Sequence, residues 1–155
     1  ASDAGGSKGF PNLRDAEWHW GGTPAEIEAT IAKGRNAVMP PFGQALGGEG
    51  VKDVANYVMS LSGMAADPIR VARGKPLFQA NCAACHGAEG KGNVALGAPN
   101  LTDKIWLYGS AEPTIIQTIS QGRNGVMPAW QDRLGDEKVK LLAAYVWGLS
   151  NSPAK

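Results

Sequence analysis

Apolar residues recur at helical spacing in two matching segments, one in each half of the chain. Within each segment they lie at i, i+3, i+4 and i+7, the spacing that gathers side chains on one face of an α-helix. The two stripes are Val51, Val54, Ala55 and Val58, and Val139, Leu142, Ala143 and Val146. They predict helices over residues 49–61 and 136–149, the second capped at its start by Asp136.

Local start and stop signals predict three further helices. Asp67 before Pro68 suits an N-cap followed by proline at the first helical position, so a helix should run to about Asn81, with Pro76 as a possible kink. Shorter helices fit residues 24–33 and 112–121, each followed by a glycine that suits a C-cap. The glycine-rich segment 87–99 is expected to be loop. The chain is therefore predicted to be all-α with long loops.

The chain contains an internal repeat. Residues 9–62 align without a gap with residues 97–150, and about half of the aligned positions are identical. Shared phrases include Pro-Asn-Leu, Gly-Arg-Asn and Val-Met-Pro. The repeat predicts two copies of one domain, residues 1–63 and 68–155, joined by a linker at 64–67. The second copy is complete, whereas the first lacks its N-terminal helix.

The segment Cys82-Ala83-Ala84-Cys85-His86 has the C-x-x-C-H pattern that attaches a c-type haem. Cys82 and Cys85 can reach both vinyl groups of one porphyrin, and His86 can place an imidazole nitrogen on the iron. A structural zinc site would need a second pair of ligands, and there is no third cysteine. A thioredoxin-type redox pair would stand beside a βαβ pattern, which the chain lacks. One complete haem c site is expected.

Met127 is the expected sixth ligand of this haem. It lies in a turn-like segment before Pro128, which biases it away from helix. Histidine and methionine together raise the reduction potential, which suits electron transfer. A fully ligated iron also argues against catalysis at this haem. Arg123 and Arg35, just before the two methionines, and Trp130 are candidates for binding haem propionates.

The repeat also predicts a second haem. The position equivalent to Cys82 falls a few residues before Ala1, so either the chain is part of a longer protein or the first copy never bound haem. We expect the first alternative, with a first C-x-x-C-H immediately upstream in the parent protein. Met39, equivalent to Met127, would be the sixth ligand of that haem. Without it, the first half-domain should be poorly ordered unless it packs on the second domain or on another chain.

Composition restricts the function further. The 155 residues carry 15 Lys and Arg against 14 Asp and Glu, so nothing argues for nucleic acid. The sequence contains no run of 18 apolar residues, so it predicts no membrane-spanning helix in this chain. No nucleophile or general-base constellation stands out, so we expect an electron carrier that is not an enzyme on its own.

Several longer motifs resemble a known family. The phrases G-F-P-N-L-x-D-x-x-W-x-W-G-G at 9–22, G-A-P-N-L-T-D-x-x-W-L-Y-G at 97–109 and G-R-N-G-V-M-P-A-W at 122–130 are similar to the dihaem subunit, subunit III, of cbb3-type cytochrome c oxidases. The resemblance implies two tandem class I cytochrome c domains, the first lacking its N-terminal helix and attachment motif here. It implies a membrane-anchored protein on the periplasmic side of the bacterial inner membrane.

The resemblance also implies partners. Electrons would pass from a soluble c-type cytochrome towards the monohaem subunit and the catalytic core of the oxidase. Two alternatives remain open at this point. One is a free-standing dihaem carrier of the cytochrome c4 type. The other is a haem-based gas sensor or peroxidase, which would need an open or labile sixth position on the iron.

Overall fold

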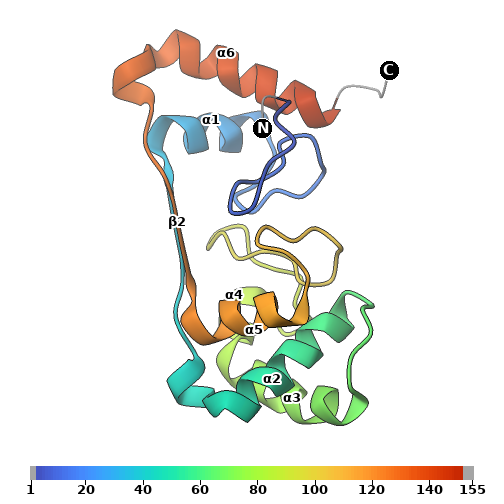
Figure 1. Cartoon of the computed structure of the whole chain (residues 1–155). Helices are drawn as coiled ribbons and strands as arrows, with labels where there is room; N and C mark the ends of the chain where they lie inside the picture. Colours follow the sequence, from blue (N-terminus) through green and yellow to red (C-terminus); the bar gives the residue numbers. More distant parts are fainter. Residues whose placement is uncertain (1–2, 152–155) are drawn as a thin grey trace.

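The computed structural model describes residues 3–151 and forms an elongated molecule with a helical unit at each end (Figure 1). Its elements in chain order are α1 (Pro24–Lys33), β1 (Arg35–Met39), α2 (Gly43–Leu61), α3 (Pro68–Asn81), α4 (Ala83–His86), α5 (Glu112–Gln121), β2 (Arg123–Met127) and α6 (Gln131–Asn151). The predicted bounds of α1, α3 and α5 are confirmed. Helices α2 and α6 begin earlier than predicted, because each carries a short preceding turn joined through a kink at Gly47 or Gly135.

Local capping explains where α1 and α3 begin and where α1 and α5 end. The Asp67 carboxylate accepts hydrogen bonds from the backbone N–H groups of Ile69 and Arg70, as its N-cap role requires. Helix α1 begins with a capping box between Thr23 and Glu26. Helices α1 and α5 end at Gly34 and Gly122, whose φ values of 69° and 71° favour glycine.

A two-stranded antiparallel sheet joins the two ends of the molecule, and the all-α prediction misses it. Strands β1 and β2 pair so that Arg35 lies opposite Met127 and Met39 lies opposite Arg123. The turn-like interpretation of residues 124–128 is therefore wrong. Each strand satisfies the other's backbone N–H and C=O groups, and proline after each methionine favours extended backbone.

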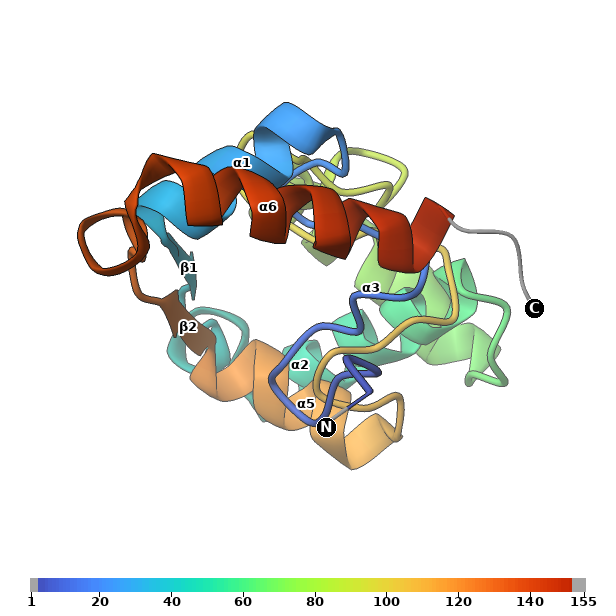
Figure 2. The ribbon, with the colours of Figure 1, turned by 90° about the horizontal axis from the view of Figure 1, so that it is seen from above.

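The helices pack across the boundary between the two sequence repeats. Helix α2, from the first repeat, packs on α3 and α5 of the second, whereas α6, from the second repeat, packs on α1 of the first. Figure 1 shows these two groups at opposite ends of the molecule, and Figure 2 shows α6 lying along α1. One core is formed mainly by α2, α3 and α5, and a smaller core by α1 and α6. The division into residues 1–63 and 68–155 describes the repeat, and each packed unit combines parts of both.

Helices α2 and α3 cross closely. Gly74 lies against the carbonyl oxygen of Asp53, and a Cβ on Gly74 would come within 3.0 Å of the Tyr57 Cβ. The missing side chain therefore allows the close approach. Beside this crossing the Tyr57 and Phe78 rings pack with their centroids 5.1 Å apart, and Phe78 is fully buried. Aromatic burial of this kind is a large stabilising contribution to a small core.

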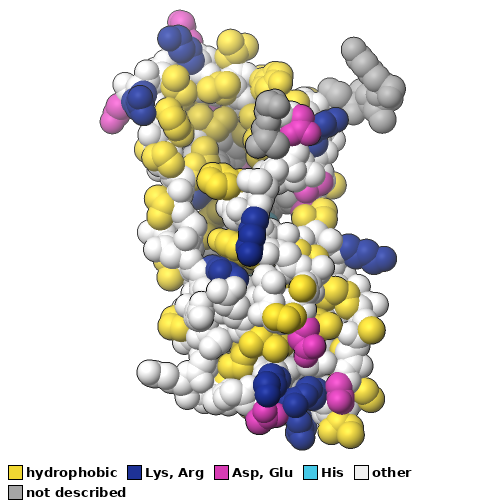
Figure 3. Space-filling view, viewed as in Figure 1, with side chains coloured by type: hydrophobic (Ala, Val, Ile, Leu, Met, Phe, Trp, Pro, Cys, Tyr) yellow, Lys and Arg dark blue, Asp and Glu magenta, His cyan; other side chains and the backbone are white. Residues whose placement is uncertain are grey.

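An ion-pair network fixes the same two helices. The buried Asp53 carboxylate accepts hydrogen bonds from Arg73 Nε at 2.9 Å and from Arg70 Nη1 at 2.8 Å. Arg70 also reaches Glu49 at 3.0 Å. The hydrogen bonds from Arg73 and Arg70 hold the pKa of Asp53 below its ordinary value against the opposing effect of burial. Figure 3 shows basic and acidic side chains intermixed at this end of the molecule.

Helix α6 exposes part of the face that α2 buries. Tyr145 occupies the repeat position of Tyr57, yet it is 64% exposed whereas Tyr57 is 8% exposed. Leu141, Leu142 and Trp147 are also exposed. Figure 3 shows hydrophobic side chains gathered at the end of the molecule formed by α1 and α6.

Among residues 3–151, no helix combines the length and the apolar character needed to cross a lipid bilayer.

Asp53→Asn should weaken the packing of α2 on α3. The change removes a charge from a buried network, so we expect unfolding free energy to fall by about 1–3 kcal/mol at neutral pH. The carboxylate stabilises the fold above its ordinary pKa, and this contribution is lost as pH falls through the lowered folded-state pKa. The difference between wild type and variant should therefore shrink below about pH 4. Denaturant unfolding at several pH values measures both effects.

Glu137→Gln is the matched control, because Glu137 is exposed on α6. It should change stability by less than about 0.5 kcal/mol. An Asp53→Asn variant as stable as this control at neutral pH would show that the network does not hold the two helices together.

Candidate haem-binding site

The C-x-x-C-H motif lies on one short turn of helix at the end of α3. Cys82 is the C-cap of α3 and the N-cap of α4. Its carbonyl oxygen accepts hydrogen bonds from the backbone N–H groups of Cys85 at 3.2 Å and His86 at 3.0 Å. The thiols of Cys82 and Cys85 are free, with Cys82 buried and Cys85 exposed. A single turn therefore keeps both thiols and the imidazole in one small region, as attachment to one porphyrin requires.

His86 is held in the form that can ligate a metal. Its ring is largely buried, and Nδ1 lies 3.1 Å from the carbonyl oxygen of Pro99. Because a carbonyl oxygen only accepts, this contact assigns the proton to Nδ1 and leaves the Nε2 lone pair free. Burial lowers the pKa of His86, which favours the neutral imidazole. Both effects suit an axial ligand.

The loop that supplies Pro99 is tied back to the motif. The backbone N–H of Gly92 donates to the carbonyl oxygen of His86 at 2.8 Å, and that of Leu101 donates to Gly90 at 2.7 Å. Gly92 has a φ of 82°, and a Cβ there would meet the backbone of Asn100 at 2.7 Å. Glycine at this position therefore permits the close approach that brings the Pro99 carbonyl to the imidazole.

The chemistry of the donor set fits a haem better than a redox pair or zinc. Burial, with a smaller contribution from Cys85, raises the pKa of the Cys82 thiol to about 11, whereas reactive redox cysteines have lowered values. In the part of the chain that the structure describes, no group of three or more His, Cys, Asp or Glu side chains is arranged so that it could hold a metal ion by itself. Two neighbouring thiols and one oriented imidazole remain, which are the groups that bind a haem c.

Apolar side chains surround Cys82. It belongs to the larger core with Phe78, Val54 and Ile115, and further partly buried side chains pack against that core. These include Met39, Leu101 and Trp106. The haem ring would therefore find an apolar environment next to its attachment point.

The structure brings Met39, and not Met127, to the core that contains Cys82. Met39 packs against that core and lies opposite Arg123 in the sheet. Met127 lies opposite Arg35 at the other end of the sheet and is 37% exposed. The sequence assigned Met127 to the haem of His86 on the assumption that each repeat folds on itself. The difference between Asp53 and Leu141, at equivalent positions of two otherwise similar helices, is a sequence signal that distinguishes the helix packed on α3.

The two arginines expected to bind propionates occupy equivalent places at the two ends of the sheet. Arg123 stacks on the Tyr108 ring at 4.4 Å, and Arg35 stacks on Trp20 at 4.7 Å. Their guanidinium groups also donate to Thr118 and Thr30, respectively. Arg123 lies on the same end of the sheet as Met39, whereas Arg35 lies beside Met127.

Trp130 is not brought to the thiols. It packs against the smaller core of α1 and α6, and Arg133 lies 5.1 Å above its ring. Its backbone N–H donates to the carbonyl oxygen of Ile31 at 3.1 Å. Trp130 therefore helps to join α6 to α1. This position does not support its predicted role as a propionate ligand of the haem of His86.

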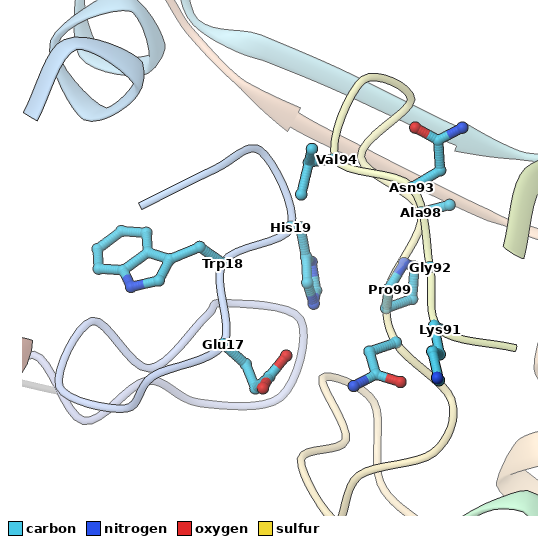
Figure 4. A pocket seen from close by; sticks show the side chains of 10 residues that line it. Glu17, Trp18, His19, Lys91, Gly92, Asn93, Val94, Ala98 and Pro99 are labelled. Atoms are coloured by element: carbon cyan, nitrogen blue, oxygen red, sulfur yellow. The ribbon is translucent and has the colours of Figure 1, made fainter. Parts of the chain in front are cut away.

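The loops of the two repeats meet between the two ends of the molecule. A cavity of about 360 Å³ lies between Trp18 and His19 of the first repeat and Gly92 and Pro99 of the second (Figure 4). His19 is partly buried, and burial lowers its pKa. A second cavity of about 480 Å³ is lined by segment 5–19 and by Ile105 to Gly109. The loop that orients His86 thus contacts the first repeat directly.

Comparison with known proteins supports a cytochrome. Residues 2–58 and 70–146 match the family described as cytochrome c oxidase, cbb3-type, subunit III. The chain is 50% identical to the cbb3-type cytochrome c oxidase subunit FixP of Sinorhizobium medicae, over 96% of this chain and 54% of that protein. It is 51% identical to FixP of Bradyrhizobium diazoefficiens, over 96% and 55%.

A relative with a different subunit name gives the same result. The chain is 49% identical to subunit CcoP of Rubrivivax gelatinosus, over 97% of this chain and 50% of that protein. The chain spans about half the length of the curated relatives that it matches. Since the family match covers most of the sequence, the chain belongs to the cbb3-type cytochrome c oxidase subunit III family.

Proposed function

We propose that this chain carries electrons through a haem c bound covalently by Cys82 and Cys85. The observation that carries the proposal is the orientation of His86, whose Nδ1 is engaged by Pro99 while Nε2 remains available for iron. When bound, the haem iron supplies a one-electron redox couple. The protein supplies the thioether attachment, the axial imidazole and an apolar surrounding.

A methionine completes the coordination in this proposal. A thioether as sixth ligand stabilises ferrous iron and raises the potential, as electron transfer requires. The repeat offers Met127 and Met39 at equivalent sequence positions. With both axial positions filled, the iron offers no site to a substrate, so the subunit is not an enzyme on its own.

The family supports a proposal for the larger assembly in which the chain works. We propose that it relays electrons from a soluble c-type cytochrome towards the monohaem subunit and catalytic core of a cbb3-type oxidase. It would work on the periplasmic side of the bacterial inner membrane, attached through a membrane anchor in the longer protein. This proposal is supported by the FixP and CcoP relatives, which are subunits of cbb3-type cytochrome c oxidases.

We further propose that the longer protein holds a second haem, in a tandem pair of class I cytochrome c domains. Arg35 and Met39 repeat Arg123 and Met127, so the first repeat retains residues that would serve a haem. The exposed apolar face of α6 is also what an N-terminal helix equivalent to α3 would cover, because α3 covers the matching face of α2.

Replacing both thiols, Cys82→Ser with Cys85→Ser, should abolish covalent haem on this chain. The expected product is apoprotein or protein whose haem is extracted by acidic solvent, because no thioether can form. Pyridine haemochrome spectra and intact mass measure this. Ala84→Ser, at an exposed position between the cysteines, is the control and should keep one haem. Covalent haem in the double variant would contradict the attachment assignment.

The reduced holoprotein should bind carbon monoxide slowly and weakly. Both axial positions are filled in the proposed state, so a protein ligand must leave before carbon monoxide can enter. Stopped-flow absorbance after mixing measures the rate. Rapid, stoichiometric binding by intact protein would instead favour a gas sensor or peroxidase.

The longer natural protein should contain two haems per chain. Pyridine haemochrome absorbance against protein mass gives the ratio directly. A ratio of one, together with an upstream sequence that lacks C-x-x-C-H, would mean that the first repeat serves only structure or docking.

A further inference from the structure

We propose that Glu17, a residue of the first repeat, makes the reduction potential of the haem held by His86 depend on pH. In this proposal the ionised Glu17 binds Asn100 and the protonated Glu17 binds Asp103. The inference rests on the proposed haem function. It concerns a positioning residue that belongs neither to the attachment motif nor to the proposed axial ligands.

Glu17 lies where a loop of the first repeat meets the loop that orients His86. It lines the cavity of about 360 Å³ whose opposite wall includes Pro99 and Asn100. Figure 4 shows its side chain directed from the first-repeat loop towards the segment that contains Pro99. Glu17 is half-buried, so a charge on its carboxyl group is screened less by salt than a charge on the open surface.

The Glu17 carboxyl group interacts with two side chains of the second repeat, Asp103 and Asn100. A hydrogen bond between two carboxyl groups requires that one of them carries a proton. The Asn100 Oδ1 already accepts from the Thr102 hydroxyl at 2.7 Å and from the Thr102 backbone N–H at 3.0 Å. The Asn100 amide nitrogen is therefore left to donate to Glu17, and an ionised carboxylate is the stronger acceptor.

Fixed neighbours raise the proton affinity of Glu17. Burial is the largest cause of its raised pKa, and the next is the negative charge of Asp103, with a smaller effect of Asp15. Backbone N–H groups hold both aspartates in place, because Asp15 accepts from Glu17 at 3.0 Å and Asp103 accepts from Ile105 at 2.8 Å. The contact with Asn100 acts in the opposite direction.

Other titratable groups surround Glu17. Those that interact with it or line the cavities beside it are Lys8, Asp15, His19, Lys91, Asp103 and Tyr108. Burial lowers the pKa of His19 despite the two aspartates, so this imidazole is neutral at neutral pH. Lys91 pairs with Glu89 at 2.9 Å. The nearest described charges that act on Glu17 are therefore the two aspartates, which favour its protonated form.

Asn100 connects Glu17 to the axial histidine. It directly follows Pro99, whose carbonyl oxygen lies 3.1 Å from His86 Nδ1. An ionised Glu17 bound to Asn100 places a negative charge beside this loop. Ferric haem carries one more positive charge than ferrous haem, so the negative charge favours the ferric form and lowers the potential. By linkage, reduction of the haem raises the proton affinity of Glu17 by the same free energy.

The proposed step balances charge and atoms. A soluble c-type cytochrome supplies one electron, which converts ferric iron to ferrous iron, and water supplies a proton to the Glu17 carboxylate. The hydrogen bond from Asn100 is exchanged for one that Glu17 donates to Asp103, and no covalent bond of the chain breaks. Oxidation of the haem releases the proton again.

The sequence repeat shows that this arrangement is one-sided. Asp15 and Asp103 occupy equivalent positions, as do Asn12 and Asn100. Ile105 stands where the first repeat has Glu17, and an isoleucine cannot bind a proton. The second repeat therefore offers no equivalent of Glu17 to the loop of the first.

Reduction potentials of the holo-form of this chain, measured at several pH values, test the proposal. In wild type the potential should fall as pH rises above about 4.5, the ordinary range of a glutamic acid. Glu17→Gln keeps the shape of the side chain and can donate to Asp103 at every pH. It should hold the potential near its low-pH value, with at least half of the fall lost.

Glu137→Gln is the matched control, because it removes the same charge from an exposed position on α6. It should keep the wild-type pH profile. The haem propionates titrate in all three proteins, so they do not affect the comparison. Equal pH profiles in wild type and Glu17→Gln would overturn the inference.

Asp103→Asn tests the partner of the protonated form. The change removes the charge that disfavours an ionised Glu17, so the fall in potential should move to lower pH. A fall that stays at the same pH would show that Asp103 does not set the proton affinity of Glu17.

Infrared difference spectra protect the test against a misfolded variant. Reduction of wild type should produce the C=O band of a protonated carboxyl group. Heavy-isotope labelling of glutamate carboxyl carbons should shift this band, which separates Glu17 from the haem propionates. Absence of a labelled band overturns the inference without any variant. A wild-type chain that attaches no haem would overturn the proposed function, whereas a pH-independent potential would leave that function intact.

Discussion

The contact between α2 and α3 is the interaction on which the haem half of the molecule depends. Helix α3 has only two buried residues, Gly74 and Phe78, and both lie against α2 or its aromatic Tyr57. It also runs directly into Cys82. A helix with so little core of its own is stable mainly through its partner. The geometry of the thiols and of His86 therefore depends on a helix supplied by the other sequence repeat.

Local sequence signals predicted the parts of the fold that local interactions decide. The cap at Asp67 and the glycines at 34 and 122 give α1, α3 and α5 their ends. The sheet escaped prediction because its two strands are far apart in sequence and neither has a partner nearby. A segment such as 123–127 reads equally well as a turn until a second strand is present to pair with it.

The same distinction separates the parts of the site. The spacing of Cys82, Cys85 and His86 was sufficient to propose haem attachment, because all three lie on one helical turn. The Pro99 carbonyl was not predictable, since it reaches His86 only through a loop held by Gly92. Repeat alignment could not show that Met39, and not Met127, packs against the core that contains Cys82, because the two residues have similar neighbours in sequence.

Duplication leaves a chain with two equally good ways to pair its halves, and few residues decide between them. The apolar stripes of α2 and α6 are similar, so they contribute about equally to either arrangement. The hydrogen bonds of Asp53 and Asn56 remain as a difference between the two arrangements, because Leu141 and Ala144 cannot form them. A difference of about 1.4 kcal/mol already favours one arrangement tenfold. Two diverged positions can therefore favour α2 over α6 as the partner of α3, although the strands that precede the two helices have hardly changed.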